Sequence, residues 1–193
     1  TMKHGWIGEH LNQSFTKENI STKPAEIIRA KQNIVLIGMP SCGKSTVGKL
    51  LSEKLGRELV ETDRRIAEKA GRTIPEIFAS GGEAVFREME SEVIREVSAK
   101  TGVVIATGGG TPIRRENVTA LKENGRLYFL DRPLECLVPT EDRPLSSTRE
   151  AIERLYRERY DIYTGAADVR IEVDGDACRV MEKIVEEFFR MKT

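Results

Sequence analysis

Residues 38–45 read Gly-Met-Pro-Ser-Cys-Gly-Lys-Ser and match the pattern G-x-x-x-x-G-K-[ST] at every fixed position. An apolar run precedes them and a helical pattern follows, so they stand where a strand turns into a helix. Glycines let backbone N–H groups turn inward around phosphate oxygens, Lys44 adds a mobile cation, and the Ser45 hydroxyl is a ligand for Mg²⁺. We therefore expect a nucleotide-phosphate site formed by Gly38, Met39, Pro40, Ser41, Cys42, Gly43, Lys44, Ser45 and Thr46.

Two carboxylates stand at the end of the next apolar run, in Glu61-Thr62-Asp63. The carboxyl end of a parallel strand faces the edge at which open α/β sheets bind ligands. There Asp63 can orient a hydroxyl or accept its proton, and Glu61 can hold Mg²⁺ through a water molecule. The alternative is that Asp63 only caps the helix expected at 64–70. The position of Asp63 favours the chemical role.

Arg87 lies on a helical pattern that we expect at 83–100, after two glycines. It is next to Phe86, which belongs to an apolar stripe, so Arg87 cannot lie at the centre of the buried face and can point toward the sheet edge. Glu90 is three residues on and can fix the guanidinium, which prepares an arginine to bind an anion. A plain surface ion pair is the alternative.

Three further segments could contact a ligand. Gly108-Gly109-Gly110 ends a strand and allows a ligand to approach the backbone closely. The turn-rich segment 138–149 resembles a mobile cover that carries Arg143 and excludes water from a reacting phosphoryl group. Arg159 lies on the helix expected at 149–163, where a solvated charged face is the simpler interpretation of Arg149, Arg154 and Arg157.

From Asn33 onward, apolar strands alternate with charged helices. We expect strands at 33–37, 58–62, 103–107, 126–130 and 169–173, and helices at 44–55, 64–70, 83–100, 114–123, 149–163 and 176–191. This alternation predicts an α/β fold in which helices cover both faces of a parallel sheet. Residues 1–32 have no sustained period, so we expect an N-terminal extension followed by one domain at 33–193.

Composition excludes several classes of function. The chain has 193 residues, with 31 Lys+Arg and 31 Asp+Glu, so no net field favours nucleic acid or a membrane surface. The spacing of its three cysteines and two histidines suits neither a disulfide framework nor a zinc site. No apolar run is long enough to span a membrane, and the start does not resemble a signal sequence. We expect a monomeric cytoplasmic protein that acts on a small molecule.

In their order and spacing, several segments together resemble the shikimate kinases, P-loop enzymes that use ATP and Mg²⁺ to phosphorylate the 3-hydroxyl of shikimate in aromatic amino-acid biosynthesis. These segments are "GMPSCGKSTVG", "ETD", "GRTIPEIFASGGEAVFREME", "ATGGGT", "DRPL" and "RERYDIY". The resemblance covers about residues 33 to 190. It implies a three-layer P-loop kinase fold with a five-stranded parallel sheet and a lid, and the activity of a shikimate kinase.

The resemblance also implies a role for each candidate residue. Asp63 would face the acceptor hydroxyl, and Arg87 and Arg159 would bind the shikimate carboxylate. The backbone of Gly108, Gly109 and Gly110 would close the acceptor pocket. Arg143 would reach the transferring phosphoryl group opposite Lys44. The catalytic residues are then Asp63, Lys44 and Arg143.

The chain departs from the family pattern at two places. The family commonly has Asp where Glu61 stands, and many relatives carry an adenine-packing Arg where this chain has Cys136 and Leu137, so we assign no adenine contact. Residues 4–18 resemble the opening of the shikimate dehydrogenases, with Ser14 and Thr16 in place of a substrate-binding serine pair. The rest of that enzyme is absent from this sequence, so we interpret the segment as a remnant of a fusion without dehydrogenase activity.

Two other functions remain open at this point. Another small-molecule P-loop kinase, such as a gluconate kinase, would use the same phosphate loop but would not need two arginines for a ring carboxylate. A nucleotide-binding module without turnover would need only the loop, and its N-terminal segment would recruit a partner.

Overall fold

The structure, a computed structural model, describes residues 29–140 and 143–190. Five strands form one parallel sheet in the order β2-β3-β1-β4-β5. Their bounds are β1 Asn33–Ile37, β2 Leu59–Glu61, β3 Val104–Ala106, β4 Gly125–Asp131 and β5 Val169–Glu172. The predicted parallel five-stranded sheet is therefore confirmed, with each strand within a few residues of its expected position.

Strand β1 occupies the centre of the sheet. It pairs with β3 on one side, where Val35 is opposite Ile105, and with β4 on the other, where Val35 is opposite Leu127. All five residues of β1 are fully buried. A strand covered on both faces reads as a continuous apolar run rather than an alternating one, which is why the run before the phosphate loop could be recognised.

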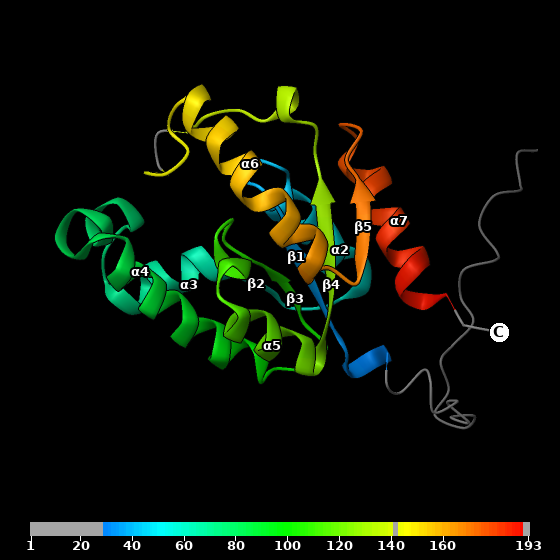
Figure 1. Cartoon of the computed structure of the whole chain (residues 1–193). Coiled ribbons are helices and arrows are strands. Elements are labelled where there is room, and N and C mark those ends of the chain that lie inside the picture. The colour runs from blue at the N-terminus through cyan, green and yellow to red at the C-terminus, as the bar shows by residue number, and fades with distance from the viewer. Residues whose placement is uncertain (1–28, 141–142, 191–193) are drawn as a thin grey trace, which may run out of the picture.

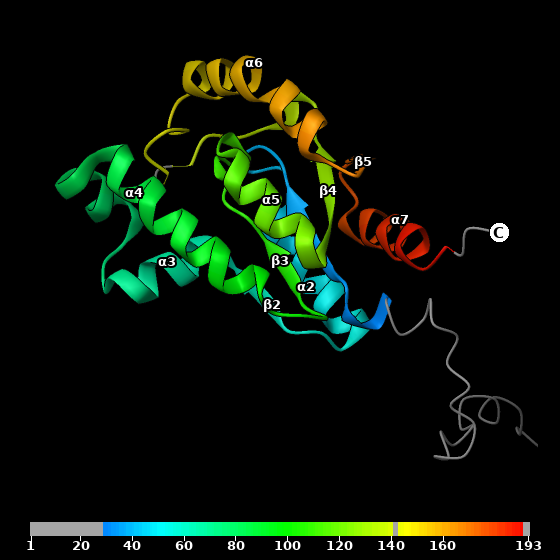
Figure 2. The same cartoon turned by 60° about the horizontal axis from the view of Figure 1, so that its bottom comes forward.

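The helices form the two outer layers of the fold (Figure 1 and Figure 2). On one face of the sheet α2 packs against α7, and on the other α4 packs against α5. Helix α6 contacts β4 and the short turn η1. The helix bounds are α2 Lys44–Leu55, α3 Thr62–Ala70, α4 Ile74–Ser98, α5 Arg115–Asn124, α6 Arg149–Ala166 and α7 Ala177–Phe189, with 3-10 turns η1 Thr111–Ile113 and η2 Leu134–Cys136.

Helix α4 begins nine residues before its predicted start at 83, because it has two halves that meet at a kink. Gly82 has φ 71° and ψ −176°, a backbone conformation outside the helical region. The first half begins with a capping box, in which the Thr73 side chain and the Glu76 side chain each bind the other's backbone N–H, and Pro75 follows the cap. The prediction missed this half although its starting signal is present in the sequence.

The chain before β1 makes specific contacts with the domain from Arg29 onward. Arg57 donates from Nη1 to the carbonyl oxygen of Gln32 at 2.8 Å and from Nη2 to that of Arg29 at 3.0 Å. The predicted boundary at residue 33 therefore falls inside a packed segment. Residues 1–28 lie outside the described residues, and with them the segment 4–18. Among the described helices, none is long and apolar enough to cross a membrane.

Candidate active site

The phosphate loop connects the buried strand β1 to the first turn of α2. Gly38 and Gly43 have φ values of 146° and 105°, which residues with a Cβ atom rarely adopt. A Cβ atom on Gly38 would lie 2.8 Å from the carbonyl oxygen of Leu130, so this position also has no space for one. Both glycines therefore have backbone conformations that a residue with a Cβ atom rarely adopts.

Lys44 lies inside this loop and is almost fully buried. Its Nζ donates hydrogen bonds to the carbonyl oxygens of Gly38 and Met39, both at 2.8 Å. Burial lowers the pKa of Lys44 from its ordinary value, since removal from water disfavours the charged form. A bound phosphate would supply the negative charge that this buried ammonium group lacks.

Two cavities meet at the carboxyl edge of the sheet. The first, which we call the loop cavity, is lined by Ser41, Gly43, Lys44, Ser45, Thr46, Glu61, Asp63, Arg64, Ala106, Thr107, Arg132, Thr140 and Arg143. It brings five of the nine predicted loop residues together with both predicted carboxylates, whereas Gly38, Met39, Pro40 and Cys42 do not line it. The side chains of Met39 and Cys42 are instead buried in the core, so only their backbone can contribute to a phosphate site. Pro40 lines the neighbouring cavity.

The second cavity, which we call the arginine cavity, is lined by Pro40, Asp63, Ile74, Phe78, Phe86, Arg87, Glu90, Gly108, Gly109, Gly110, Arg143, Pro144, Leu145, Ser146 and Arg159. It collects three predicted arginines and the glycine triplet around one space. Asp63 and Arg143 line both cavities. A group bound in the arginine cavity therefore meets a group bound in the loop cavity between these two side chains.

Asp63 is the second residue of α3, and the N-cap position of this helix belongs to Glu61. Its Oδ1 atom is buried and has no hydrogen-bond partner among the described residues. Burial raises the pKa of Asp63 from its ordinary value, although Arg143, Lys44 and Arg87 act in the opposite direction. The alternative interpretation of Asp63 as a helix cap is therefore wrong, and the residue instead lines both cavities.

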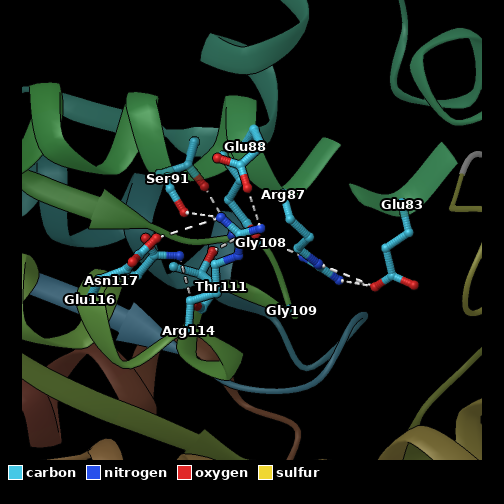
Figure 3. A network of polar contacts seen from close by, with 12 residues as sticks. Glu83, Arg87, Glu88, Ser91, Gly108, Gly109, Thr111, Arg114, Glu116 and Asn117 are labelled. Atoms are coloured by element: carbon cyan, nitrogen blue, oxygen red, sulfur yellow. Dashed lines mark hydrogen bonds and ion pairs between the residues drawn. The ribbon is translucent and has the colours of Figure 1, made fainter. Parts of the chain in front are cut away.

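Arg87 is held by two carboxylates on its own helix. Its Nη1 donates to Glu90 at 2.7 Å, and its Nη2 donates to Glu83 at 3.0 Å, as Figure 3 shows for Glu83. Glu90 is fully buried and Arg87 is 7% exposed. The pair is therefore not a surface ion pair, and that alternative is wrong. The predicted role of Glu90 in fixing the guanidinium agrees with these contacts.

Arg159 is also buried, at 5% exposed, but it has different neighbours. None of the ion pairs among the described residues involves it. It lies beside Tyr163, whose hydroxyl donates to the carbonyl oxygen of Gly109 at 2.6 Å. Because a buried cation without an anionic partner is costly, the arginine cavity favours an anionic ligand.

Arg149, expected on a solvated face, donates to the carbonyl oxygen of Leu137 at 3.1 Å.

The glycine triplet leaves space for functional side chains. A Cβ atom on Gly108 would lie 2.5 Å from Oδ1 of Asp63, one on Gly109 would lie 2.8 Å from Pro40, and one on Gly110 would overlap the guanidinium of Arg87. The N–H group of Gly108 already donates to the Thr62 hydroxyl at 2.9 Å. In this structure, therefore, protein side chains lie close to the backbone of the three glycines, where the sequence predicted the close approach of a ligand.

Several residues that the sequence did not single out support the site. The Thr111 hydroxyl donates to Oε1 of Glu90 at 2.7 Å, and Nδ2 of Asn117 donates to the Thr111 carbonyl oxygen at 3.0 Å. Figure 3 shows Thr111 and Asn117 beside the glycine turn. Arg132, which follows β4 directly, lines the loop cavity. Its position after an apolar strand was the one signal in the sequence that could have identified it.

The loop cavity also has oxygen ligands that suit Mg²⁺. The Ser45 hydroxyl and the Glu61 carboxylate line it together with Lys44. Mg²⁺ prefers a few hard oxygen ligands and keeps several water molecules. A Mg²⁺ ion held by Ser45 and Glu61 would complete its coordination with phosphate and water oxygens. Among the described residues, no cluster of three or more His, Cys, Asp or Glu occurs.

The chain is similar to known proteins over most of its length. A family model described as "Shikimate kinase" matches residues 40–189. The shikimate kinase of Clostridium botulinum (strain Alaska E43 / Type E3) is 44% identical over 158 residues, which are 80% of this chain and 95% of that protein. The shikimate kinase of Persephonella marina is 40% identical over 149 residues, which are 75% of this chain and 90% of that protein.

Two solved structures are similar as well. The shikimate kinase from Acinetobacter baumannii in complex with shikimate has a TM-score of 0.79 and 34% sequence identity, and the match covers 85% of this chain and 96% of that one. The shikimate kinase from Aquifex aeolicus has a TM-score of 0.70 and 36% identity, over 80% of this chain and 94% of that one. The chain therefore belongs to the shikimate kinase family.

Proposed function

We propose that this protein transfers the γ-phosphoryl group of ATP to the 3-hydroxyl of shikimate, in the pathway to chorismate and the aromatic amino acids. The observation that carries the proposal is that Asp63 and Arg143 line both cavities. ATP would place its phosphates in the loop cavity, and shikimate would occupy the arginine cavity. The family membership supports this choice of substrates.

The arginine cavity binds the shikimate carboxylate through Arg87 and Arg159. Both guanidinium groups are buried, and charge-assisted hydrogen bonds to a carboxylate are roughly twice as strong as neutral ones. Arg87 is already oriented by Glu90, so little conformational freedom is lost when the ligand binds. The backbone of Gly108, Gly109 and Gly110 forms the wall against the ring of the acceptor.

Asp63 orients the 3-hydroxyl toward the γ-phosphorus and accepts its proton as the new O–P bond forms. The bond between the γ-phosphorus and the bridging oxygen breaks, and ADP leaves. Lys44 and Arg143 are placed on the loop cavity, where they neutralise the charge of the transferring phosphoryl group. Arg143 lies in the segment 138–149 that we proposed as a cover, of which residues 141–142 lie outside the described residues.

Mg²⁺ would be held by the Ser45 hydroxyl and, through water, by Glu61, and it would neutralise negative charge on the phosphates of ATP. We propose that the enzyme acts as a cytoplasmic monomer. All the residues to which we assign a role in the site lie in one chain.

ADP release by the full-length protein, measured with ATP and Mg²⁺ and with or without shikimate, tests the proposal. Shikimate-dependent release, with 3-phosphoshikimate as the product, is expected. Turnover with gluconate but not with shikimate would identify a different small-molecule kinase. ATP binding without turnover of any acceptor would identify a nucleotide-binding module, and either result would contradict the proposed activity.

A further inference from the structure

Ser41 has an unusual backbone conformation for its residue type. Its φ is 63°, and it is the one non-glycine residue with positive φ among residues 29–140 and 143–190. The left-handed conformation is less favourable than the right-handed one for a residue with a Cβ atom. Glycine would occupy this position of the loop without that cost, so the serine side chain is expected to make a compensating contact.

That contact joins two segments far apart in the sequence. The Ser41 hydroxyl donates to the carbonyl oxygen of Val138 at 2.9 Å, across 97 residues. The neighbouring carbonyl oxygen, that of Leu137, accepts from Arg149 at the start of α6. Two consecutive carbonyl groups are therefore held by different elements, one by the phosphate loop and one by α6.

The segment held in this way leads directly to Arg143. The amide of Arg143 donates to the carbonyl oxygen of Thr140 at 3.3 Å, and the amide of Thr140 donates to that of Ser146 at 3.3 Å. Thr140 and Arg143 line the loop cavity together with Ser41. A displacement of Val138 would therefore be passed on to the guanidinium that reaches the phosphoryl group.

We propose that Ser41 is a positioning residue, whose hydroxyl fixes the segment that carries Arg143 against the phosphate loop. This inference rests on the proposed function of Arg143. It assigns to the Ser41 side chain a role that the backbone of the loop does not fulfil. The phosphate loop and the segment 137–140 then move as one unit when phosphate binds.

Two substitutions separate the hydroxyl from the backbone conformation. Ser41→Ala removes the hydrogen bond and keeps a Cβ atom at positive φ, whereas Ser41→Gly removes the bond and relieves the strain. We expect kcat for shikimate phosphorylation to fall about tenfold in both variants, since both lose the hydroxyl. Ser41→Gly is expected to have the higher thermal midpoint. Ser52→Ala is the matched control. It loses the hydrogen bond from the Ser52 hydroxyl in α2 to the carbonyl oxygen of Arg57 just after this helix, and it should keep kcat within about twofold.

The same substitutions in an Arg143→Ala background decide whether Ser41 acts through Arg143. If it does, Ser41→Ala changes kcat by less than about twofold there, because the group being positioned is gone. An equal fold loss in both backgrounds would overturn the proposal. Normal kcat in Ser41→Gly with reduced kcat in Ser41→Ala would also overturn it, since strain rather than the hydroxyl would then matter.

Amide hydrogen exchange of the peptides that contain Val138, Thr140 and Ser146 gives a readout independent of the acceptor. With ADP bound, exchange in this segment should be slower in the wild type than in Ser41→Ala. Unchanged exchange would overturn the coupling. Because this measurement needs no phosphoryl transfer, it still decides the inference if the wild type fails to phosphorylate shikimate, and the two failures are distinguishable.

Discussion

In the proposed reaction Asp63 contacts the acceptor, and the burial of its carboxyl group is costly for the fold. Its Oδ1 atom is buried without a partner among the described residues, and burial raises its pKa from the ordinary value. A raised pKa suits a residue that accepts a proton near neutral pH better than an ordinary carboxylate does. The same environment disfavours the charged form of Asp63 that the proposed reaction requires.

Asp63→Asn should lower kcat by about 10² or more, because an orienting or proton-accepting carboxylate acts mainly in the transition state. ATP binding should remain near normal, since the loop cavity keeps Lys44 and Ser45. Steady-state kinetics with a separate nucleotide-binding measurement checks both. Turnover close to that of the wild type would remove Asp63 from the chemistry.

The same variant should gain stability at neutral pH. The pKa of Asp63 is raised in the folded protein, so the folded state loses stability as the pH rises and the buried carboxyl group ionises. The amide of an asparagine side chain does not ionise, so Asp63→Asn is expected to have the higher thermal midpoint at pH 7. This advantage should shrink as the pH falls and vanish below about pH 4, the ordinary value for Asp. Equal midpoints across this range would contradict the burial of an unpaired carboxylate.

Arg87 and Arg159 should respond differently to removal. Each loses a charge-assisted contact of roughly 1.5–3 kcal/mol with the acceptor, so KM for shikimate should rise at least about tenfold in both alanine variants. Only Arg87→Ala leaves a buried partner, Glu90, without its cation, so its thermal midpoint should fall much further. Exposed Arg154, changed to alanine, is the matched control. Equal effects on KM at Arg154 would refute the carboxylate-binding role.

The positions of these residues could be predicted because motifs and strand ends fix them. Lys44 follows from the loop pattern, and Asp63 and Gly108 follow from the ends of apolar runs. Thr111 could not be predicted as the partner of Glu90, since that contact joins two helical segments and depends on how they pack. The burial of Arg87 was likewise invisible, because periodicity places a residue on a helix face but does not show what covers it.

At the scale of elements, the central strands were predictable because they contain apolar runs, and β1 and β3 are buried along their whole length. The first half of α4 was missed because Gly81-Gly82 was interpreted as the start of the helix rather than as a kink inside it. Phe78 before the kink packs against Phe86 after it, with ring centroids 4.9 Å apart. Both rings line the arginine cavity, so the kink shapes its wall.

Gly82→Ala tests this role of the kink. A Cβ atom at position 82 would meet no other atom within 4 Å, so the cost is conformational, about 1–3 kcal/mol for φ 71° and ψ −176°. The first half of α4 should shift and raise KM for shikimate more than KM for ATP. Gly165→Ala within α6 also meets no atom within 4 Å, has no positive φ, and should instead stabilise by up to about 1 kcal/mol. Similar behaviour of the two variants would show that the kink is not required.

At the scale of the whole molecule, the proposed activity depends on the convergence of two cavities on Asp63 and Arg143. Asp63 lies at the start of α3, just after β2, and Arg143 lies 80 positions later, in the segment before α6. Sequence order alone does not show that they share a space. The parallel sheet explains it, since the carboxyl ends of its strands lie at one edge.

The last prediction concerns the chain before β1. Every proposed site residue follows Asn33, so a protein that starts at Arg29 should keep kcat within about threefold, a barrier change below roughly 0.7 kcal/mol. A protein that starts at Asn33 also lacks the carbonyl groups that Arg57 binds and the Lys31 carbonyl oxygen that accepts from Gly102. It should have a lower thermal midpoint at unchanged kcat. If the first truncation is stable but no longer phosphorylates shikimate, then residues 1–28 contribute to the active site and are not a remnant.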